Sequence, residues 1–430
     1  MNESLDPKAG SDDASARPDD ETVFASRSAT ESATQATPHA EPLPLEGLRV
    51  LDFSQFLAGP SCALRLADLG ADVVKIERPQ GGDLCRQLYV ADQALDGDSV
   101  LFHTINRNKR SFAADLKQPA DLERVKALVA RADVLIHNFR PGVMERLGLG
   151  YEVVRDLNAR LVYATVTGYG ELGPWRDKPG QDLLAQSLSG LTWLSGDATQ
   201  GPVPVGVSIA DIVTGAHLVQ GVLAALLRRG VTGRGGRVEV SLMESILDLQ
   251  FEQITTFLCG DGSVPRRASV NNASVYGAAP YGLYATADGY LALAMAPIPR
   301  LAQLLDCAPL AAFDDASQWF ARRDEIKAIL RDHLATQATA HWLARLEPAD
   351  IWCAPVQDYA TLTAHGGFAA LDMTQAITNS AGHSLTTLRC PIRIDGVVLK
   401  SPRAAPALGE HTAQVAAGWQ IDATPTHPTE

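Results

Sequence analysis

Residues 164–190 place one of their carboxylates, Asp182, at a turn between a strand and a helix. The segment reads ATVTGYGELGPWRDKPGQDLLAQSLSG, and Asp182 stands where a loop rich in glycine and proline meets an apolar-periodic helix over residues 182–188. The first N–H groups of a helix are unpaired and its dipole favours negative charge, so we expect an ionised carboxylate there. Such a carboxylate could act as a nucleophile beside an oxyanion site. A plain helix N-cap is the alternative role.

Alternating strands and helices precede this turn and must hold it. Apolar strands are expected over residues 48–53, 72–76, 133–137 and 161–166. Helices are expected between them, over residues 59–70, 119–132, 142–147 and 151–157. The alternation predicts an α/β fold with a parallel sheet, in which ligands bind at the carboxyl ends of the strands. The candidate ligand-binding loops are therefore those that follow the strands, over residues 54–58, 77–83, 138–142 and 167–181.

Other familiar chemistries lack their motifs. No GxGxxG follows a strand, no GxxxxGK[ST] loop occurs, and no GxSxG is present to seat a serine nucleophile. The ten histidines show no HExxH or HxH spacing, and the six cysteines form no CxxC pair. We therefore expect no metal and no tightly bound cofactor.

Composition excludes several classes of protein. The chain has 430 residues and a net charge of −13, which argues against a nucleic-acid surface. Residues 1–42 are acidic, poor in large apolar residues and expected to be a disordered tail without the features of a signal or transit peptide. No apolar run is expected to reach membrane-spanning length, so no membrane partner is expected. The scattered cysteines suit reduced, buried thiols and a cytoplasmic location.

The length predicts more than one domain. A large domain is expected over residues 43–230, a linker over 231–259 and a smaller α/β domain over 260–345. Residues 345–425 are expected to return to the large domain, and residues 416–430 to end in a C-terminal tail.

Several motifs in one order resemble the family III CoA-transferases, the CaiB/BaiF or formyl-CoA transferase family. They are PLEGLRVLDFSQFLAGP, LADLGADVVKIERPQGGD, NRNKRS, DLKQP, ADVLIHNFRPGVMERLGL, TGYGELGP, GQDLLAQSLSG, TGRGGRVEVSLMESIL and PALGEHTAQV. The resemblance covers residues 43–415 and implies a Rossmann-like large domain with a small α/β domain in an interlocked homodimer.

The resemblance also implies a reaction. Members move CoA from an acyl-CoA to a free carboxylic acid, and the family's catalytic aspartate falls on Asp182. Its carboxylate would form a mixed anhydride and then an aspartyl-CoA thioester, which is nucleophilic catalysis. The two substrates are thus acyl-CoA and a small carboxylic acid, with short dicarboxylates and hydroxy acids frequent in the family.

Further site residues follow by similarity to formyl-CoA transferase. The expected CoA-binding residues are Phe56, Leu57 and Ala58 at the thiol end, Arg78, Ala114 and Lys117 at the nucleotide, Asn138, Phe139 and Arg140 along the channel, and Arg146 at a phosphate. Arginine and lysine suit phosphates. The acid substrate is expected to meet Gln55, Tyr169 and Gln181. The single-residue alternatives are solvated charge for Arg78 and Lys117, and core packing for Phe56 and Phe139.

This chain departs from formyl-CoA transferase at several positions. Leu57 replaces a glutamine, Thr167 replaces a lysine, and the glycine-rich flap has no clear equivalent in residues 263–282. These departures argue against a formyl and oxalate substrate pair.

Two alternative functions remain. The α-methylacyl-CoA racemases of the same superfamily use a histidine before the aspartate together with a later aspartate, to which Asp211 is similar. Gln181 occupies the histidine position, and a neutral amide cannot carry a proton at pH 7. A non-catalytic CoA-binding protein is the other alternative, against which Asp182 itself argues.

Overall fold

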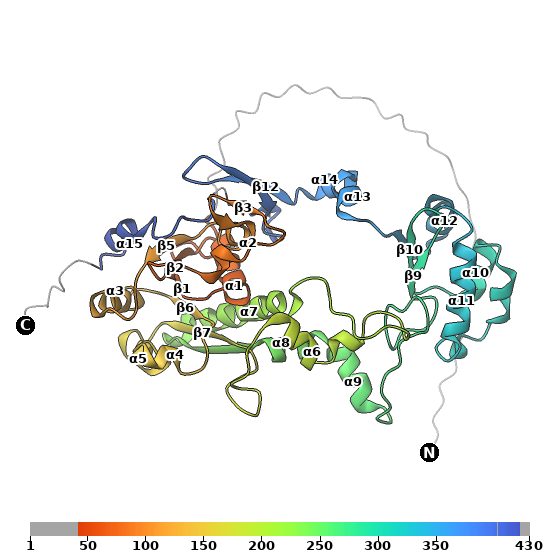
Figure 1. Cartoon of the computed structure of the whole chain (residues 1–430), viewed down its shortest axis with the longest axis horizontal. Coiled ribbons are helices and arrows are strands. Elements are labelled where there is room, and N and C mark those ends of the chain that lie inside the picture. Colours follow the sequence, from red (N-terminus) through yellow and green to blue (C-terminus); the bar gives the residue numbers. More distant parts are fainter. Residues whose placement is uncertain (1–41, 402, 422–430) are drawn as a thin grey trace, which may run out of the picture. The chain divides into compact units, whose positions relative to one another are not determined.

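The computed structural model describes residues 42–401 and 403–421, shown in colour in Figure 1. The folded elements belong to one unit that begins at Leu43. The acidic tail expected over residues 1–42 lies outside the described residues except for residue 42.

A six-stranded sheet carries the larger part of the fold. Its order is β5-β2-β1-β6-β7-β8, and every neighbouring pair is parallel. The strands are β1 (Arg49–Asp52), β2 (Asp72–Glu77), β5 (Arg110–Ala113), β6 (Val134–His137), β7 (Val162–Thr167) and β8 (Gly236–Ser241). The α/β class and the parallel sheet are confirmed. The edge strand β5 was not predicted, because its polar sequence RSFA lacks an apolar run.

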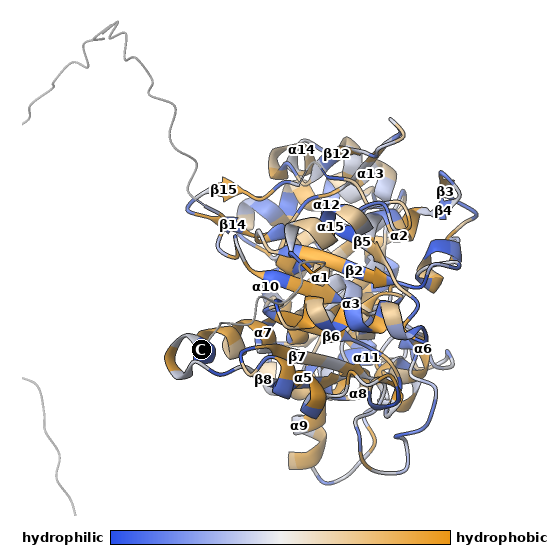
Figure 2. Cartoon of the chain, turned by 90° about the vertical axis from the view of Figure 1, so that its left-hand side faces the viewer, coloured by the Kyte–Doolittle hydropathy of each residue, from blue (hydrophilic) through white to orange (hydrophobic). Residues whose placement is uncertain are grey.

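Helices cover both faces of this sheet (Figure 1). Helices α1 (Ala58–Asp68) and α7 (Ile209–Thr232) lie on one face, and α3 (Pro119–Val129), α5 (Tyr151–Leu157) and α15 (Thr412–Gly418) on the other. Strand β6 shows why both faces of the sheet must be covered. Val134 and Ile136 join the core of the first face while Leu135 joins that of the second, so a continuous apolar run is buried on both sides. Each such side chain contributes about 1.5–3 kcal/mol. In Figure 2 the central strands are accordingly drawn in the hydrophobic colour.

Helix α7 corrects one expectation. It has the length and apolar composition that a membrane-spanning helix needs, although no such run was expected from the sequence. Leu218, Val222 and Ala225 are buried in the same core as α1. At Gly215 an added Cβ would lie 2.8 Å from the Ala58 carbonyl oxygen, so α7 packs directly on α1. Packing in the core accounts for these residues, whereas Ile212, Leu227 and Val231 of the same helix are exposed.

The smaller part is built on an antiparallel sheet of β9 (Gly282–Ala285), β10 (Tyr290–Leu293) and β11 (Cys353–Pro355). Helices α10 (Ile298–Leu304), α11 (Arg323–Leu334) and α12 (Thr339–Leu346) pack around one core that includes Tyr284 and Trp342. Strand β11 lies just past residue 345, where the small domain was expected to end.

Residues 231–259, expected as a linker, contain the end of α7, β8 and two helices. The apolar pattern of residues 242–259 predicts one continuous helix, and that prediction is wrong. The chain breaks at Gln250, whose φ of −101° and ψ of 17° leave helical values and separate α8 (Leu242–Leu249) from α9 (Phe251–Cys259). No residue of α9 is buried, and Cys259 at its end is exposed rather than buried as expected.

The C-terminal segment packs on the parallel sheet. The His411 N–H donates to Ser111 O, and Trp419 Nε1 donates to Asp72. Val415, Ala416 and Trp419 are buried in the core of the second face, so the expected tail from residue 416 packs on the sheet as far as residue 421. The remaining elements are β3 (Ala94–Leu95), β4 (Asp98–Ser99), α2 (Val100–Ile105), α4 (Val143–Arg146), α6 (Asp182–Leu188), α13 (Tyr359–Ala364), α14 (Gly366–Leu371), β12 (Thr374–Thr378), β13 (Ser384–Leu388), β14 (Arg393–Ile394) and β15 (Val397–Val398).

Candidate active site

Asp182 is the first residue of α6 and follows the loop that leaves the carboxyl end of β7. The loop closes at its base, where Gly168 and Gly180 are in contact. Tyr169 holds the same base, because its hydroxyl donates to Pro179 O at 3.1 Å. Tyr169 is buried and was expected to meet substrate, whereas its hydroxyl is used within the loop. The other residue expected there, Gln181, is exposed and is the N-cap residue of α6, with no side-chain capping bond.

The Asp182 carboxylate does not cap its own helix. Its Oδ1 accepts hydrogen bonds from the N–H of Ala210 at 2.7 Å and of Asp211 at 3.4 Å, at the beginning of α7. Ser208, the N-cap residue of α7, makes no side-chain capping bond. Asp182 therefore occupies the place of that missing cap from another part of the chain, where free N–H groups and the helix dipole favour its negative charge.

Gln186 holds the second oxygen of this carboxylate. Its Nε2 donates to Asp182 Oδ2 at 2.7 Å, and its Oε1 accepts the Val205 N–H at 2.9 Å. Because the Val205 bond fixes the amide orientation, Gln186 can only donate toward Asp182. Both side chains are almost fully buried, with exposed fractions of 6% for Asp182 and 1% for Gln186. Each carboxylate oxygen can accept more than one bond, so this contact leaves Oδ2 an unused lone pair.

Asp211 lies next to this carboxylate on the first turn of α7. Burial, and then the negative charge of Asp182, raise the pKa of Asp211 to about 7. Asp211 is therefore about half protonated at pH 7. It can hold a proton beside Asp182, which the similarity to the racemase aspartate alone does not establish.

A cavity of about 380 Å³ opens at the carboxyl ends of β1, β2, β5 and β6. It gathers five of the residues expected to bind CoA or the acid, namely Gln55, Arg78, Ala114, Lys117 and Phe139. Arg78 and Lys117 are exposed, so their charges stand at its surface. Arg78 is partly fixed by a bond from its Nε to Gly82 O at 3.2 Å. Two cations at the mouth of a cavity with an apolar wall suit a phosphorylated nucleotide.

The other expected CoA-binding residues lie around this cavity without lining it. Asn138 bonds the backbone of Gln55, and Phe56 is 45% exposed. Leu57 is the N-cap residue of α1, and Ala58 is buried at the first position of that helix. Arg140 is exposed, and Arg146 is exposed at the last position of α4, next to Gly142.

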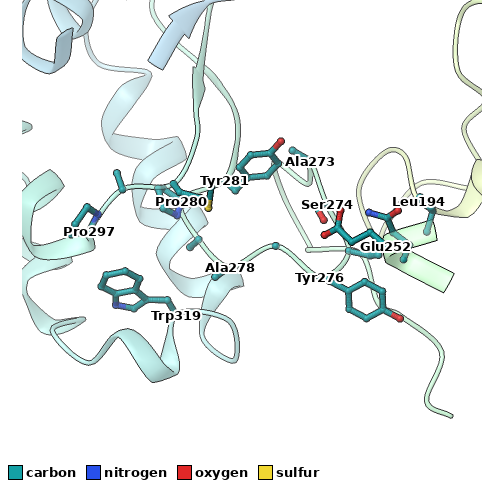
Figure 3. Close-up of a pocket in the computed structure, with 16 residues that line it drawn as sticks. Leu194, Glu252, Ala273, Ser274, Tyr276, Ala278, Pro280, Tyr281, Pro297 and Trp319 are labelled. Carbon is teal, nitrogen blue, oxygen red and sulfur yellow. The ribbon is translucent and has the colours of Figure 1, made fainter. Parts of the chain in front are cut away.

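A larger cavity of about 830 Å³ lies between α9 and the smaller part of the fold (Figure 3). Tyr276, Tyr281 and Trp319 contribute aromatic surface, and Glu252 lies at the end near Leu194. A third cavity has a volume of about 650 Å³. It is lined by three segments of the chain, within residues 189–198, 250–257 and 264–267, and these include Trp193 and Phe257. Asp182 lines none of these three cavities.

The described part of the chain offers no candidate metal site, and its buried histidine at the end of β6 is uncharged. Within residues 42–401 and 403–421, no group of three or more His, Cys, Asp or Glu side chains is placed to hold a metal ion. His137, at the end of β6, is buried, and burial with the charge of Arg237 lowers its pKa to about 4. It is a neutral side chain that contacts Thr165 through Nε2 at 3.1 Å.

Sequence reasoning missed the contacts that hold Asp182 and Gln55 in place. Gln186 could have been found, because residues four apart share a helix face and Gln and Asp pair there. The N–H groups of Ala210 and Asp211 come from 28 and 29 residues further along the chain, and no local pattern indicates that contact. The hydrogen bond from the Gln55 N–H to Asn138 joins residues that are 83 positions apart, and no local pattern indicates it either.

Comparison with known proteins adds a second line of information. The model of CoA-transferase family III matches residues 45–412. A succinate–glutarate CoA-transferase of Agrobacterium fabrum is 32% identical over 88% of this chain and 96% of its own length. A succinyl-CoA–L-malate CoA-transferase beta subunit of Chloroflexus aurantiacus is 34% identical over 87% and 93%. A succinyl-CoA:mesaconate CoA-transferase of Haloarcula hispanica is 33% identical over 86% and 95%.

Solved structures give the same result. A CaiB/BaiF family protein from Brucella suis superposes with a TM-score of 0.77 at 31% identity, over 88% of this chain and all of its own. A protein from Mycobacterium tuberculosis has a TM-score of 0.74 at 30% identity over 86% of this chain and 99% of its own.

Proposed function

This chain belongs to CoA-transferase family III and transfers CoA between an acyl-CoA and a carboxylic acid, and we propose that it does so through a covalent intermediate on Asp182. We propose further that succinyl-CoA is the donor and a four- or five-carbon dicarboxylic acid the acceptor. The relatives named above support this choice, because each is named for succinate or succinyl-CoA and a dicarboxylic acid.

The proposed transfer has four balanced steps. Asp182 Oδ2 bonds the thioester carbonyl carbon, the C–S bond breaks, and CoA leaves as the thiolate. That thiolate attacks Asp182 Cγ and releases the donor acid, which leaves an aspartyl-CoA thioester. The acceptor carboxylate then attacks the same Cγ, forms a new anhydride and expels the thiolate. Finally the thiolate attacks the acceptor's carbonyl carbon, which gives the new acyl-CoA and restores Asp182.

The contact between Asp182 Oδ1 and the Ala210 N–H carries this proposal. Whenever a nucleophile adds to Cγ, negative charge develops on Oδ1, and the 2.7 Å N–H donor is already in place to stabilise it. The Asp211 N–H, at 3.4 Å, lies close enough to shorten its contact as that charge grows. Gln186 keeps Oδ2 oriented for the first attack.

CoA itself is proposed to bind along the carboxyl edge of the sheet. The cavity with Arg78 and Lys117 would hold the phosphorylated nucleotide, and the pantetheine arm would run from there past the turn at residues 54–58 toward Asp182. The order of the strands supports this path. Strand β1 lies between β2 and β6, and β7 is next to β6, so the cavity and the loop that carries Asp182 lie at the same carboxyl edge of the sheet.

We also propose that the active enzyme is a homodimer. Helix α6 exposes Leu183, Leu184 and Leu188, and α9 exposes Phe251 and Leu258, the last two at 69% and 73%. Apolar surface of this kind indicates an interface. A second copy seated there would exclude water from the surroundings of Asp182. Light scattering behind gel filtration would test the proposal, and a monomer at working concentration would contradict it.

The decisive experiment pairs an activity assay with trapping of the intermediate. Wild-type protein, Asp182→Asn and the matched control Asp177→Asn, an exposed carboxylate of the same loop, are assayed with succinyl-CoA and a panel of dicarboxylic acids. We expect no transfer by Asp182→Asn and normal transfer by Asp177→Asn. Hydroxylamine added during turnover should leave a hydroxamate on the peptide that contains Asp182, detected by mass spectrometry. Active exchange without that product would contradict the covalent route.

A further inference from the structure

Phe56 has a backbone conformation that its side chain disfavours. Its φ is +64°, in the left-handed region, where bulky residues are rare. In the described part of the chain, the other non-glycine residues with positive φ are Ala, Asp, Asn and Gln, so Phe56 is the aromatic exception. Strain of this kind persists only where the surrounding structure imposes it, and it gathers at functional sites.

Asn138 imposes this conformation from one side. Its Oδ1 accepts the Gln55 N–H at 2.9 Å, and its Nδ2 donates to Gln55 O at 2.7 Å. The side-chain amide therefore holds both backbone polar groups of the residue before Phe56, and it does so from the loop after β6, the strand that pairs with β1. With both functions engaged, the orientation of the Asn138 amide is fixed.

Asp83 imposes the conformation from the other side. Its Oδ1 accepts the Phe56 N–H at 3.3 Å and the Cys85 N–H at 2.9 Å. Lys75 Nζ lies 2.8 Å from Asp83 Oδ2 and donates to Ser54 O at 2.7 Å. Burial alone would lower the pKa of Lys75, but the charges of Asp52 and Asp83 raise it above its ordinary value, so the lysine stays charged. The strained turn is thus tied to the loop after β2 by a buried ion pair.

We propose that Asn138 and Asp83 are positioning residues that hold Phe56 in this conformation, and that they thereby fix its half-exposed ring at the CoA site where the family resemblance places this turn. The inference rests on the proposed function. It gives Asn138 a different role from the channel contact that the family resemblance implies, and it assigns a role to Asp83. The turn lies at the carboxyl end of β1, and Ser54 and Gln55 on its near side line the cavity with Arg78 and Lys117.

The strain is tested by comparing Phe56→Gly with Phe56→Ala. Both variants remove the ring, but only glycine adopts positive φ without strain. We expect a higher Tm for Phe56→Gly than for Phe56→Ala, the reverse of the usual order. Equal Tm values, or a higher Tm for the alanine variant, would overturn the claim that the turn holds Phe56 under strain.

The role of the ring is tested by activity of the same proteins. Phe56→Gly and Phe56→Ala should both lose about tenfold or more in kcat/KM for the acyl-CoA, because the thioester is then less well placed for reaction. Unaltered kcat/KM in Phe56→Gly would overturn the placement of the ring beside CoA.

A double-mutant cycle tests the positioning role of Asn138. If Asn138 acts through Phe56, then Asn138→Ala lowers kcat/KM in the wild type but has little further effect in Phe56→Gly. Losses that multiply would mean that Asn138 acts independently and would overturn the proposal. Asn138→Asp keeps the acceptor for the Gln55 N–H but loses the donor to Gln55 O. This variant replaces Asn138→Ala in the cycle if the alanine variant does not fold. Asp83→Asn, which keeps an acceptor for the Phe56 N–H, should retain more activity than Asp83→Ala.

Failure of the proposed function would look different. A wild-type protein that transfers no CoA contradicts the proposed function, whereas the Tm comparison of the Phe56 variants still tests the strained turn. An active wild type with no effect of the Phe56 variants contradicts this inference alone.

Discussion

Gly168 and Gly180 meet so closely that a Cβ built on either would lie 2.6 Å from the Cα of the other. No side chain fits between the two ends of the loop at this point, so both positions require glycine. Asp182 is two residues beyond this contact. The distance between two backbones therefore determines where the candidate nucleophile stands.

Gly180→Ala should separate the base of the loop and displace Asp182. A displacement near 1 Å at a reacting group can lower the rate about a hundredfold, so we expect a loss of that order in kcat. Gly366→Ala is the matched control, because nothing lies within 4 Å of a Cβ added there. Steady-state kinetics of both variants check the prediction, and normal kcat in Gly180→Ala would contradict it.

Removing the Asp182 side chain should cost stability as well as activity. Because the carboxylate caps α7, Asp182→Ala should lower the free energy of unfolding by about 1 kcal/mol, as for other lost caps. Asp182→Asn keeps an acceptor for the Ala210 N–H and should lose less. Urea denaturation of the two variants provides the comparison. Equal stability of wild type and Asp182→Ala would show that the contact contributes nothing to the fold.

Gln186→Leu should lower kcat more than it changes the binding of CoA. The substitution removes the donor to Asp182 Oδ2 and leaves the Val205 N–H without its acceptor, while no expected CoA contact changes. We expect a loss of about ten- to a hundredfold in kcat, which is the size seen when one oriented donor is removed. Calorimetric titration with CoA is the companion measurement, and a large loss of CoA affinity would refute the assigned role.

Asp211 should contribute a loss of stability with rising pH through the range in which it titrates. Its pKa is about 7 in the folded chain, because of burial and the charge of Asp182, and ~3.9 when unfolded. Between these values Asp211 binds more protons in the folded state, so its contribution to the free energy of unfolding decreases as pH rises from about 4 to about 7. Asp211→Asn should remove this slope. Thermal melts across that range test it, and an unchanged slope would rule out Asp211 as its source.

His137 should contribute a slope of the opposite sign. Burial holds its folded pKa at about 4, below the unfolded value of ~6.5, so the unfolded state binds more protons between these values. Its contribution to stability is lost as pH falls from about 6.5 to about 4. In Asp211→Asn this loss should become visible as acid destabilisation, and His137→Gln in that background should reduce it.

The sequence predicted what depends on local patterning. Apolar runs such as Val134, Leu135 and Ile136 indicate a strand buried on both faces, and the helix that starts at Asp182 was predicted with its observed bounds. The break at Gln250 was missed, because apolar residues on both sides continue a helical period.

Contacts between distant parts of the chain could not be predicted. The hydrogen bonds from Ala210 to Asp182 and from Asn138 to Gln55 depend on how the strands are ordered in the sheet, which no short pattern specifies. The left-handed conformation of Phe56 was equally hidden, since an aromatic residue gives no hint of positive φ.

The cap that Asp182 supplies to α7 has an energetic consequence for turnover. In the proposed cycle the side chain alternates between an anion and two uncharged acyl forms, and the dipole of the 24-residue helix α7 favours the anion. The helix therefore draws the reaction back toward the free carboxylate after each exchange. Acylated protein should therefore not accumulate. Neither acid should remain bound to the enzyme as an acyl group, so the two acids should compete for CoA according to their concentrations.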